Sequence, residues 1–407
     1  MVQNWDFEVQ HQIATDLILS IGYIGQHATR LRSNLAQINT PNPAYNSLGN
    51  ALNYAVDGSD GNNGPAILSG LGVSVPSWFV AGWGEPQNNG HASVGQLLRP
   101  LPQYWNITTN CCLENLGQST YNALQSKLER RFRNGLNLLA SYTYSKTITD
   151  ADSSFSTESG FNSNVFGAQN PYNLRGEKAV SYQDIPHAFV LSYLYELPAG
   201  PGKKYLNHGV GSKVLGGWQI SGVHRYQSGS PAVINEYATA NPYSTGNYRY
   251  SLIPGQSVFG SHPASWSPAL STTWNSGCTP TNGIFAPNAP GSPSPVNCAA
   301  FEDPSAASLA GGGGYVFGNI PTAVSWWRSP GYHNEDFSLI KRTSIREGQD
   351  ILFKMDFSNA FNRHTFGGID GNPGDSYFGV PGGSGHSTIN GSNTAQRTLQ
   401  ATLRYEF

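Results

Sequence analysis

Charged residues and long apolar runs are scarce in this sequence, and both absences narrow its function. Asp, Glu, Lys and Arg make up 12% of the 407 residues, about half of the roughly 25% that is usual in globular domains. The formal net charge is -2, whereas nucleic-acid binding requires a clustered excess of Lys and Arg. An apolar run of about 18 residues, the length of a transmembrane helix, does not occur. These absences exclude a nucleic-acid-binding protein and a helical membrane protein.

Catalytic motifs are also missing. The sequence contains no H-E-x-x-H, no G-x-S-x-G and no P-loop. The run Gly311-Gly-Gly-Gly314 does not lie between a strand and the start of a helix, so it indicates a flexible loop and not a phosphate site. The 10 His residues are scattered along the chain. We therefore expect no enzymatic activity, no cofactor and no bound metal.

What the sequence does contain is glycine, proline and tyrosine. There are 47 Gly, 26 Pro and 21 Tyr, and aromatic residues make up 12% of the chain. The mean hydropathy is negative, at -0.37. This composition fits a β-sheet with one face on lipid, one face on water, and long loops. A water-soluble, secreted all-β protein has a similar composition, so the composition alone leaves both classes open.

Long segments in which apolar and polar residues alternate predict β-strands. The C-terminal stretch shows the pattern well, since Leu399, Ala401, Leu403 and Tyr405 alternate with polar residues. One segment, 120–132, also has the composition of a helix, but the hairpin signal that follows it, an Asn-Gly pair, favours a strand. The nine predicted strands are 3–13, 15–25, 120–132, 136–148, 187–198, 217–228, 334–343, 350–358 and 397–407.

The connections between the predicted strands alternate between short and long. The long ones are 26–119, 149–186, 229–333 and 359–396. Long loops without structure are uncommon in a compact soluble domain, whereas short periplasmic turns and long extracellular loops are typical of transmembrane β-barrels. We therefore predict an all-β fold, an antiparallel transmembrane barrel formed by residues 1–407.

The predicted strand count suggests that this barrel is incomplete. Bacterial single-chain barrels have an even number of strands, and counting back from a C-terminal strand that ends in the periplasm places residue 1 outside the cell. The first residues, Met1 to Asp6, also lack the basic and apolar segments of a signal peptide. We therefore expect the C-terminal portion of a barrel, of about nine or ten strands, unless one strand is hidden in 26–119 or 229–333.

Several stretches resemble the barrel of TonB-dependent outer-membrane transporters of the Oar-like group. They are Asn4-Trp-Asp-Phe-Glu-Val-Gln, Ile21-Gly-Tyr-Ile-Gly, Tyr121-Asn-Ala-Leu-Gln-Ser-Lys-Leu-Glu-Arg-Arg-Phe, Ala140-Ser-Tyr-Thr-Tyr-Ser-Lys, Asn170-Pro-Tyr-Asn-Leu-Arg, Tyr193-Leu-Tyr-Glu-Leu-Pro, Gly216-Gly-Trp-Gln-Ile-Ser-Gly and Phe357-Ser-Asn-Ala-Phe-Asn. The resemblance implies a barrel of about 22 strands, an N-terminal plug, and a TonB box that couples uptake to energy from the inner membrane. The plug and the TonB box have no counterpart in this sequence, and the resemblance fixes no substrate.

Three groups of residues are candidates for specific roles. Trp326, Trp327 and Arg328 precede a predicted strand and are the best candidates for a ligand-facing loop cluster. Tyr405 and Phe407 resemble the C-terminal signal that the barrel-assembly machinery reads. The cysteines that flank a Pro- and Asn-rich segment, Cys278 and Cys298, are predicted to form a disulfide, whereas the adjacent pair Cys111 and Cys112 is left open.

The function predicted from the sequence is the outer-membrane barrel of a TonB-dependent transporter that takes up a scarce solute, either a carbohydrate or a peptide. The expected partners are outer-membrane lipid, the barrel-assembly machinery, the solute, and the TonB complex through a plug. A secreted adhesin or carbohydrate-binding protein and an outer-membrane porin are the alternatives. The lipid-facing stripe should be free of charge, and His224 and Lys341 do not fit it well.

Overall fold

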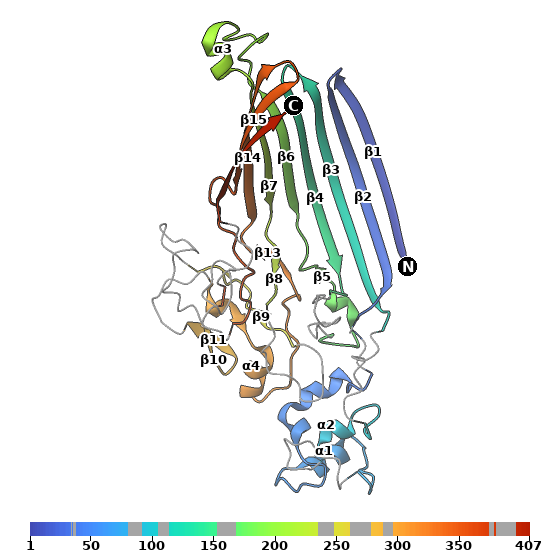
Figure 1. The fold of residues 1–407 in the computed structure, drawn as a ribbon. Helices are drawn as coiled ribbons and strands as arrows, with labels where there is room; N and C mark the ends of the chain where they lie inside the picture. The colour runs from blue at the N-terminus through green and yellow to red at the C-terminus, as the bar shows by residue number, and fades with distance from the viewer. Residues whose placement is uncertain are drawn as a thin grey trace.

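The computed structural model describes residues 1–33, 35, 38–79, 92–104, 114–152, 168–234, 248–260, 278–287, 296–373, 378–379 and 396–407. Cys111 and Cys112 lie outside these residues. The described chain contains one large sheet, and irregular structure is gathered at one end of it (Figure 1). Among the described residues, no helix is long and apolar enough to cross a membrane.

The main sheet has 10 strands, of which all but one follow each other in chain order. These are β1 (Val2–Ala14), β2 (Leu17–Leu31), β3 (Gly117–Arg133), β4 (Leu136–Thr149), β6 (His187–Glu196), β7 (Trp218–Gln227), β14 (Tyr332–Arg346), β15 (Gln349–Ser358) and β16 (Thr398–Glu406). Every neighbouring pair is antiparallel. The remaining strand, β5 (Ala179–Val180), pairs with the end of β4. The predicted all-β, antiparallel fold is confirmed, and each predicted strand corresponds to one strand of the sheet.

Short hairpins close one end of the sheet. Asn134 and Gly135 join β3 to β4 with φ angles of 54° and 81°, as a two-residue type I′ turn requires. The β1–β2 turn is fixed by Asp16, whose carboxylate accepts hydrogen bonds from Arg130 at 3.2 Å and Arg133 at 2.9 Å. The β6–β7 connection at this end carries the short helix α3 (Gly209–Leu215) (Figure 1).

The strand register places most apolar side chains of the sheet on one face, with exceptions such as Leu139, Leu194 and Val223. In each pair the residues opposite each other share a face, and the pairs Leu403–Phe353, Met355–Leu339, Leu138–Tyr193 and Ile21–Val9 are examples. The same register collects the polar residues on the other face. This polar face carries, among others, Asp6, Glu8, Ser20, Gln125, Lys127, Ser141, Ser192, Ser221, Asp336, Lys354 and Gln400.

The two residues that did not fit an uncharged stripe do lie on the apolar face, and both are accommodated by aromatic neighbours. The His224 ring stacks on Tyr193 at 5.6 Å and meets the edge of Phe337 at 5.0 Å. The Lys341 ammonium lies 5.1 Å from the centre of the Trp218 ring and donates a hydrogen bond to the carbonyl of Val214 at the short-turn end. A long basic side chain near the end of a spanning strand can reach the polar interface in this way.

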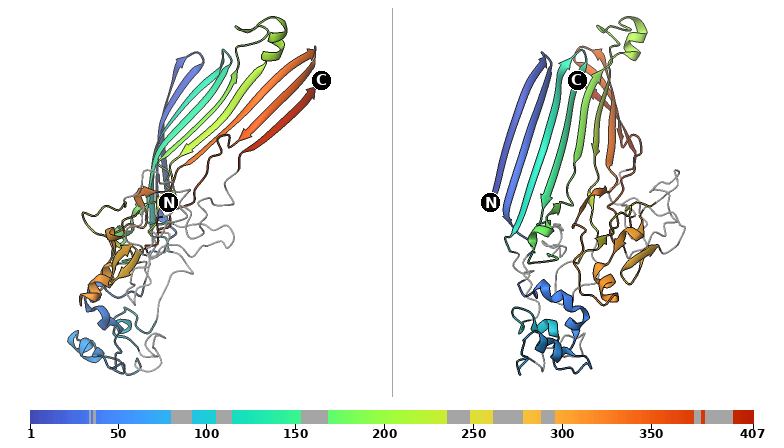
Figure 2. Two further views of the ribbon diagram at one scale, coloured as in Figure 1. Left: turned by 90° about the vertical axis from the view of Figure 1, so that its left-hand side faces the viewer. Right: turned by 180° about the vertical axis from the view of Figure 1, so that it is seen from behind.

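The sheet has two open edges among the described residues. One edge of β1 and one edge of β16 form no strand pair within this part of the chain. Both strands run from the loop end to the short-turn end (Figure 2). Antiparallel closure therefore requires an odd number of further strands between them. Together with the nine strands that follow each other in the sheet, this would give an even total.

The long connections form a loop cap, by which we mean the described parts of 32–116, 150–186 and 228–331 at the end opposite α3 (Figure 2). The first connection contains η1 (Pro43–Asn53), α1 (Gly64–Gly70) and α2 (Val94–Leu97). The second contains η4 (Leu174–Glu177) and β5. The third contains β8 (Pro231–Ala232), β9 (Ser251–Leu252), β10 (Cys278–Thr281), β11 (Ile284–Pro287), η5 (Cys298–Ala300), β12 (Phe301–Glu302), α4 (Pro304–Ala310) and β13 (Val324–Arg328).

The loop cap has two small apolar cores. The first is formed mainly by 32–116, with Leu52, Leu68, Phe79 and Val94, and is completed by Tyr315 of the third connection. The second is formed mainly by 228–331 and also includes Phe378. Its buried residues surround a disulfide between Cys278 and Cys298, whose Cα atoms are 5.6 Å apart. This is the pair that the sequence suggested, and it ties β10 to η5.

Candidate functional site

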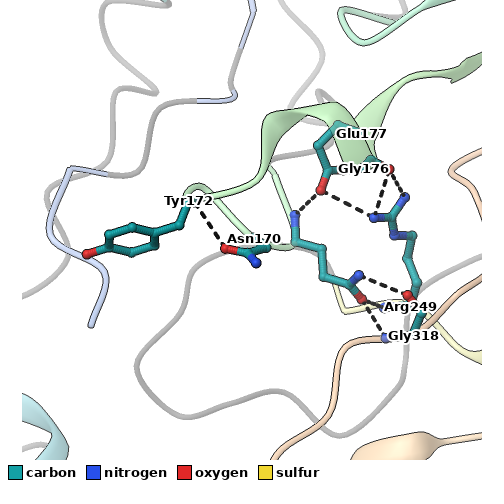
Figure 3. A network of polar contacts seen from close by, with 7 residues as sticks. Asn170, Tyr172, Gly176, Glu177, Arg249 and Gly318 are labelled. Carbon is teal, nitrogen blue, oxygen red and sulfur yellow. Dashed lines mark hydrogen bonds and ion pairs between the residues drawn. The ribbon is translucent and has the colours of Figure 1, made fainter. Parts of the chain in front are cut away.

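A buried polar network joins the second and third connections of the loop cap (Figure 3). The Glu177 carboxylate lies 3.2 Å from the Arg249 guanidinium and accepts the backbone N–H of Gln169 at 3.0 Å. The side chains of Arg249 and Glu177 are only 7% and 4% exposed. Burial raises the pKa of Glu177, and the Arg249 charge opposes this shift. Because a lone charge is costly at such a site, the two residues stabilise each other's presence there.

The side chain of Gln169 forms the centre of this network. Its Oε1 accepts the backbone N–H groups of Arg249 at 2.9 Å and of Gly318 at 3.0 Å. Its Nε2 donates to the carbonyl of Gly318 at 3.1 Å. The Gln169 side chain of the second connection thus forms hydrogen bonds with the backbone of two distant parts of the third connection, as a neighbouring β-strand would.

Contacts of the same kind tie the first connection to the other two. The Tyr172 hydroxyl donates to the carbonyl of Thr40 at 2.8 Å. The backbone N–H of Tyr315 donates to the carbonyl of Asn46 at 2.9 Å. Next to this contact Gly314 has no room for a side chain, since a Cβ would lie 2.2 Å from the Asn46 carbonyl oxygen. The three connections therefore form one interlocked cap.

Two polar hollows lie on the polar face of the sheet. One, of about 240 Å³, centres on β2 and is lined by Asp6, Glu8, Ser20, Gly22, Gln125 and Lys127, among others. The other, of about 450 Å³, lies across β4, β6, β7 and β14 and is lined by Asn137, Ser192, Ser221, Asp336 and Ser338, among others. Apolar side chains complete the linings, with Ile24 in the first hollow and Leu139, Leu194 and Val223 in the second. Both hollows thus present hydrogen-bonding groups on this face of the sheet.

The arrangement supplies binding groups and no clustered metal ligands in the part of the chain that the structure describes. Within those residues, no group of three or more His, Cys, Asp or Glu side chains is placed to hold a metal ion.

A sheet with one continuous apolar face, one polar face, short turns and long loops describes a membrane-spanning wall. The family model for the "outer membrane beta barrel domain" matches residues 1–400. The chain belongs to this family. It is a barrel domain of the Gram-negative outer membrane, and its apolar face is the face that meets lipid.

Solved structures with a similar fold include outer-membrane receptors. A Pseudomonas aeruginosa FpvA structure bound to heterologous pyoverdines is 11% identical, with a TM-score of 0.36, and the match covers 100% of this chain and 27% of that one. The ferric-catecholate import receptor Fiu from Escherichia coli K12 is 9% identical with a TM-score of 0.35, covering 99% and 27%. The Escherichia coli transporter YddB is 9% identical with a TM-score of 0.35, covering 99% and 32%. The barrel domain thus spans about a third or less of these chains. No curated protein matches the sequence.

The two tryptophans of the predicted ligand-facing cluster differ in exposure. Trp326 is 43% exposed, whereas Trp327 is only 7% exposed. Trp327 points into the core of the third connection, where it meets Phe378 at 5.7 Å. The two rings are nevertheless stacked, with centres 6.3 Å apart, and both meet the Phe259 ring edge-on.

The Arg328 side chain of the barrel domain contacts other residues of the chain and does not face an open cavity. Its guanidinium lies 2.7 Å from the Asp184 carboxylate and also donates to the carbonyls of Asp184 and Gly229. Asp184 in turn accepts the backbone N–H of Thr147 at 2.6 Å. Arg328 therefore clamps β13 to the end of β4, and its place in a ligand-facing cluster is not supported. The sequence analysis missed this clamp because the two partners are far apart in the chain.

The C-terminal residues Tyr405 and Phe407 lie together on the lipid-facing side of the barrel domain. Their ring centres are 5.8 Å apart, and Phe407 is almost fully exposed. Tyr405 pairs with Ile351 of β15, which places it on the apolar face.

Proposed function

We propose that this barrel domain forms the wall and the ligand-capturing cap of a TonB-dependent transporter of the Oar-like group. The observation that carries the proposal is the interlocking of three long connections over the loop end of a polar-faced wall, through Gln169, Tyr172 and the Glu177–Arg249 pair. A rigid cap with buried charges holds binding loops in place before a solute arrives, which lowers the entropy that binding must overcome.

The proposed substrate is a carbohydrate or a peptide, and the proposed role is not enzymatic. The polar hollows present hydroxyl, amide and carboxylate groups, which suit a solute rich in hydrogen-bonding groups. Coupling to TonB would require the plug that the family resemblance implies. Tyr405 and Phe407 are proposed as the signal for the barrel-assembly machinery, so that Phe407→Ser should lower the amount of inserted protein.

An uptake assay on cells that express the full gene product tests the proposal. The probes are a labelled glucose hexamer and a labelled hexapeptide, each supplied at low concentration with and without a protonophore. We expect accumulation of one probe above the external concentration, and its loss when the protonophore is present. Entry that is proportional to concentration and insensitive to the protonophore would instead identify a porin.

The alternative of a secreted, soluble all-β protein has a separate test. The continuous apolar face requires lipid or detergent as its partner. A protein that is recovered from the aqueous phase, monodisperse and without detergent, would rule out the barrel wall and the proposed function together.

A further inference from the structure

A basic groove lies where the sheet meets the loop cap. It has a volume of about 260 Å³ and is formed by the ends of β4 and β5 together with β13 and the residues just before it. Its lining residues are Lys146, Ile148, Lys178, Ala179, Val180, Pro321, Ala323, Ser325 and Trp326. Two ammonium groups and an exposed indole ring are thus gathered in one hollow that contains no carboxylate.

The strand register places this groove on the outer side of the wall. Lys146 and Ile148 have the same parity on β4 as Leu138, Tyr142 and Tyr144, which belong to the apolar face. Val180 is paired with Ile148 and so shares that face. The groove therefore opens toward the membrane side and not toward the interior of the barrel.

The position of the groove along the membrane normal is indicated by the aromatic residues next to it on the sheet. Tyr142 and Tyr144 pack around His187, with a hydrogen-bond distance of 2.8 Å between the Tyr142 hydroxyl and Nδ1, and with 5.1 Å between the Tyr144 and His187 ring centres. Rings with polar groups mark the boundary between hydrocarbon and headgroups in outer-membrane barrels. Lys146 follows Tyr144 by two residues, which is about 7 Å along the strand. The groove therefore lies in the headgroup layer of the outer leaflet.

The two lysines of the groove differ from three other lysines of the barrel domain. Lys127, Lys203 and Lys354 each form an ion pair with a nearby carboxylate. Among the described residues, Lys146 and Lys178 are exposed and have neither an ion pair nor a side-chain hydrogen bond. Their charge is available for a ligand, and ammonium groups are good partners for phosphate.

We propose that this groove binds the phosphorylated sugar headgroup of an outer-leaflet glycolipid. Lys146 and Lys178 pair with the phosphate, and the Trp326 indole packs against the sugar ring. The ligand is a lipid and not a dissolved anion, because the groove faces the membrane at headgroup depth. The inference rests on membership of the outer-membrane barrel family, and it does not depend on the proposed transport.

Lipid binding to the full chain, purified in detergent, tests the proposal. The probe is a bis-phosphorylated, acylated glucosamine disaccharide (lipid A) added to the micelles and measured by native mass spectrometry. We expect the double variant Lys146→Gln/Lys178→Gln to bind about tenfold to thirtyfold less of it, since each lysine near a charged membrane surface contributes a modest free energy. Trp326→Leu should lower binding to the phosphorylated lipid by a smaller factor.

The matched control is the double variant Lys203→Gln/Lys204→Gln, which removes two exposed lysines at the short-turn end. It should bind as much lipid as the unmodified chain. Equal lipid binding by the groove variant and this control would overturn the proposal, as would equal binding of the dephosphorylated lipid. If inorganic phosphate alone displaced the lipid at a similar concentration, the ligand would be a dissolved anion, and the lipid assignment would be wrong. Heat-modified mobility on gels checks that every variant is folded.

Discussion

The wall and the loop cap of this barrel domain differ in how they keep apolar and charged side chains away from water. On the wall, side chains such as Phe7, Leu403 and Tyr405 are half exposed or more, because their partner is lipid and not protein. In the loop cap, Leu52, Phe79 and Phe301 are fully buried, and even an Arg–Glu pair is removed from water. The comparison shows that the cap is built like a small soluble protein that is carried on a membrane wall.

The largest effect is expected from breaking the buried ion pair of the cap. Arg249→Met leaves the Glu177 carboxylate buried without its partner, which should destabilise the cap by about 3–5 kcal/mol. Hydrogen exchange of residues 168–177 and 248–252 measures this local stability. Exchange in β6 should not change. If the cap exchanged as slowly as in the unmodified chain, the pair would not hold the connections together.

Removal of the disulfide should have the next largest effect. The pair Cys278 and Cys298 closes a segment with a sequence separation of 20, and such a cross-link typically contributes about 3 kcal/mol. Cys278→Ser/Cys298→Ser should therefore speed proteolysis within 278–302, while the first connection keeps its resistance. Uniform proteolysis of the whole cap would show that the two apolar cores are not independent.

Charge placed on the wall should reveal which face meets lipid. Leu191→Lys introduces an ammonium on the apolar face near the middle of β6 and should cost about 2–4 kcal/mol of barrel stability. The neighbouring variant Ser192→Lys faces the polar side and should cost little. Unfolding by urea in detergent micelles or vesicles compares the two. Similar losses for both variants would contradict the assignment of faces.

The smallest effect is expected from pH, and it should be confined to the cap. Burial raises the pKa of both Glu177 and Asp152 in the folded cap. A carboxyl whose folded pKa is raised contributes stability that is present below its unfolded pKa and is lost as the pH rises through the folded pKa. Hydrogen exchange of residues 168–184 should therefore become faster as the pH is raised above about 4.5, after correction for intrinsic exchange. The variant Asp152→Asn should weaken this dependence, and an unchanged dependence would argue against the burial effect.

The accuracy of the sequence predictions differs between the same two regions. The segment 120–132 was ambiguous between helix and strand, and the following Asn134-Gly135 turn decided it correctly as part of β3. Strands that face lipid and water alternate with period two, so their local sequence carries the pattern of both environments. The cap has no such repeat. Its polar network depends on the hydrogen bond between Gln169 and Gly318. No local sequence pattern predicts this pair.

The candidate site shows the same limit at the level of single residues. Trp326, Trp327 and Arg328 are adjacent in the sequence and have different surroundings in the structure: a groove, a core and a clamp. Lys146 and Lys178 are far apart in the sequence, and the pairing of β4 with β5 brings them into one groove. The two tryptophans and Arg328 were grouped because they are adjacent in the sequence. The two lysines form a group only in the folded chain.

The sequence by itself determined the sheet: its strand positions, its antiparallel order, its apolar and polar faces, and the end at which the loops gather. These properties follow from alternation and turn chemistry, which act between near neighbours in the chain. Only the tertiary structure decided how the connections interlock, which tryptophan is exposed, and where unpaired lysines meet an aromatic ring. Those features depend on contacts between residues such as Asp184 and Arg328, whose partners are chosen by the folded chain and not by any local pattern.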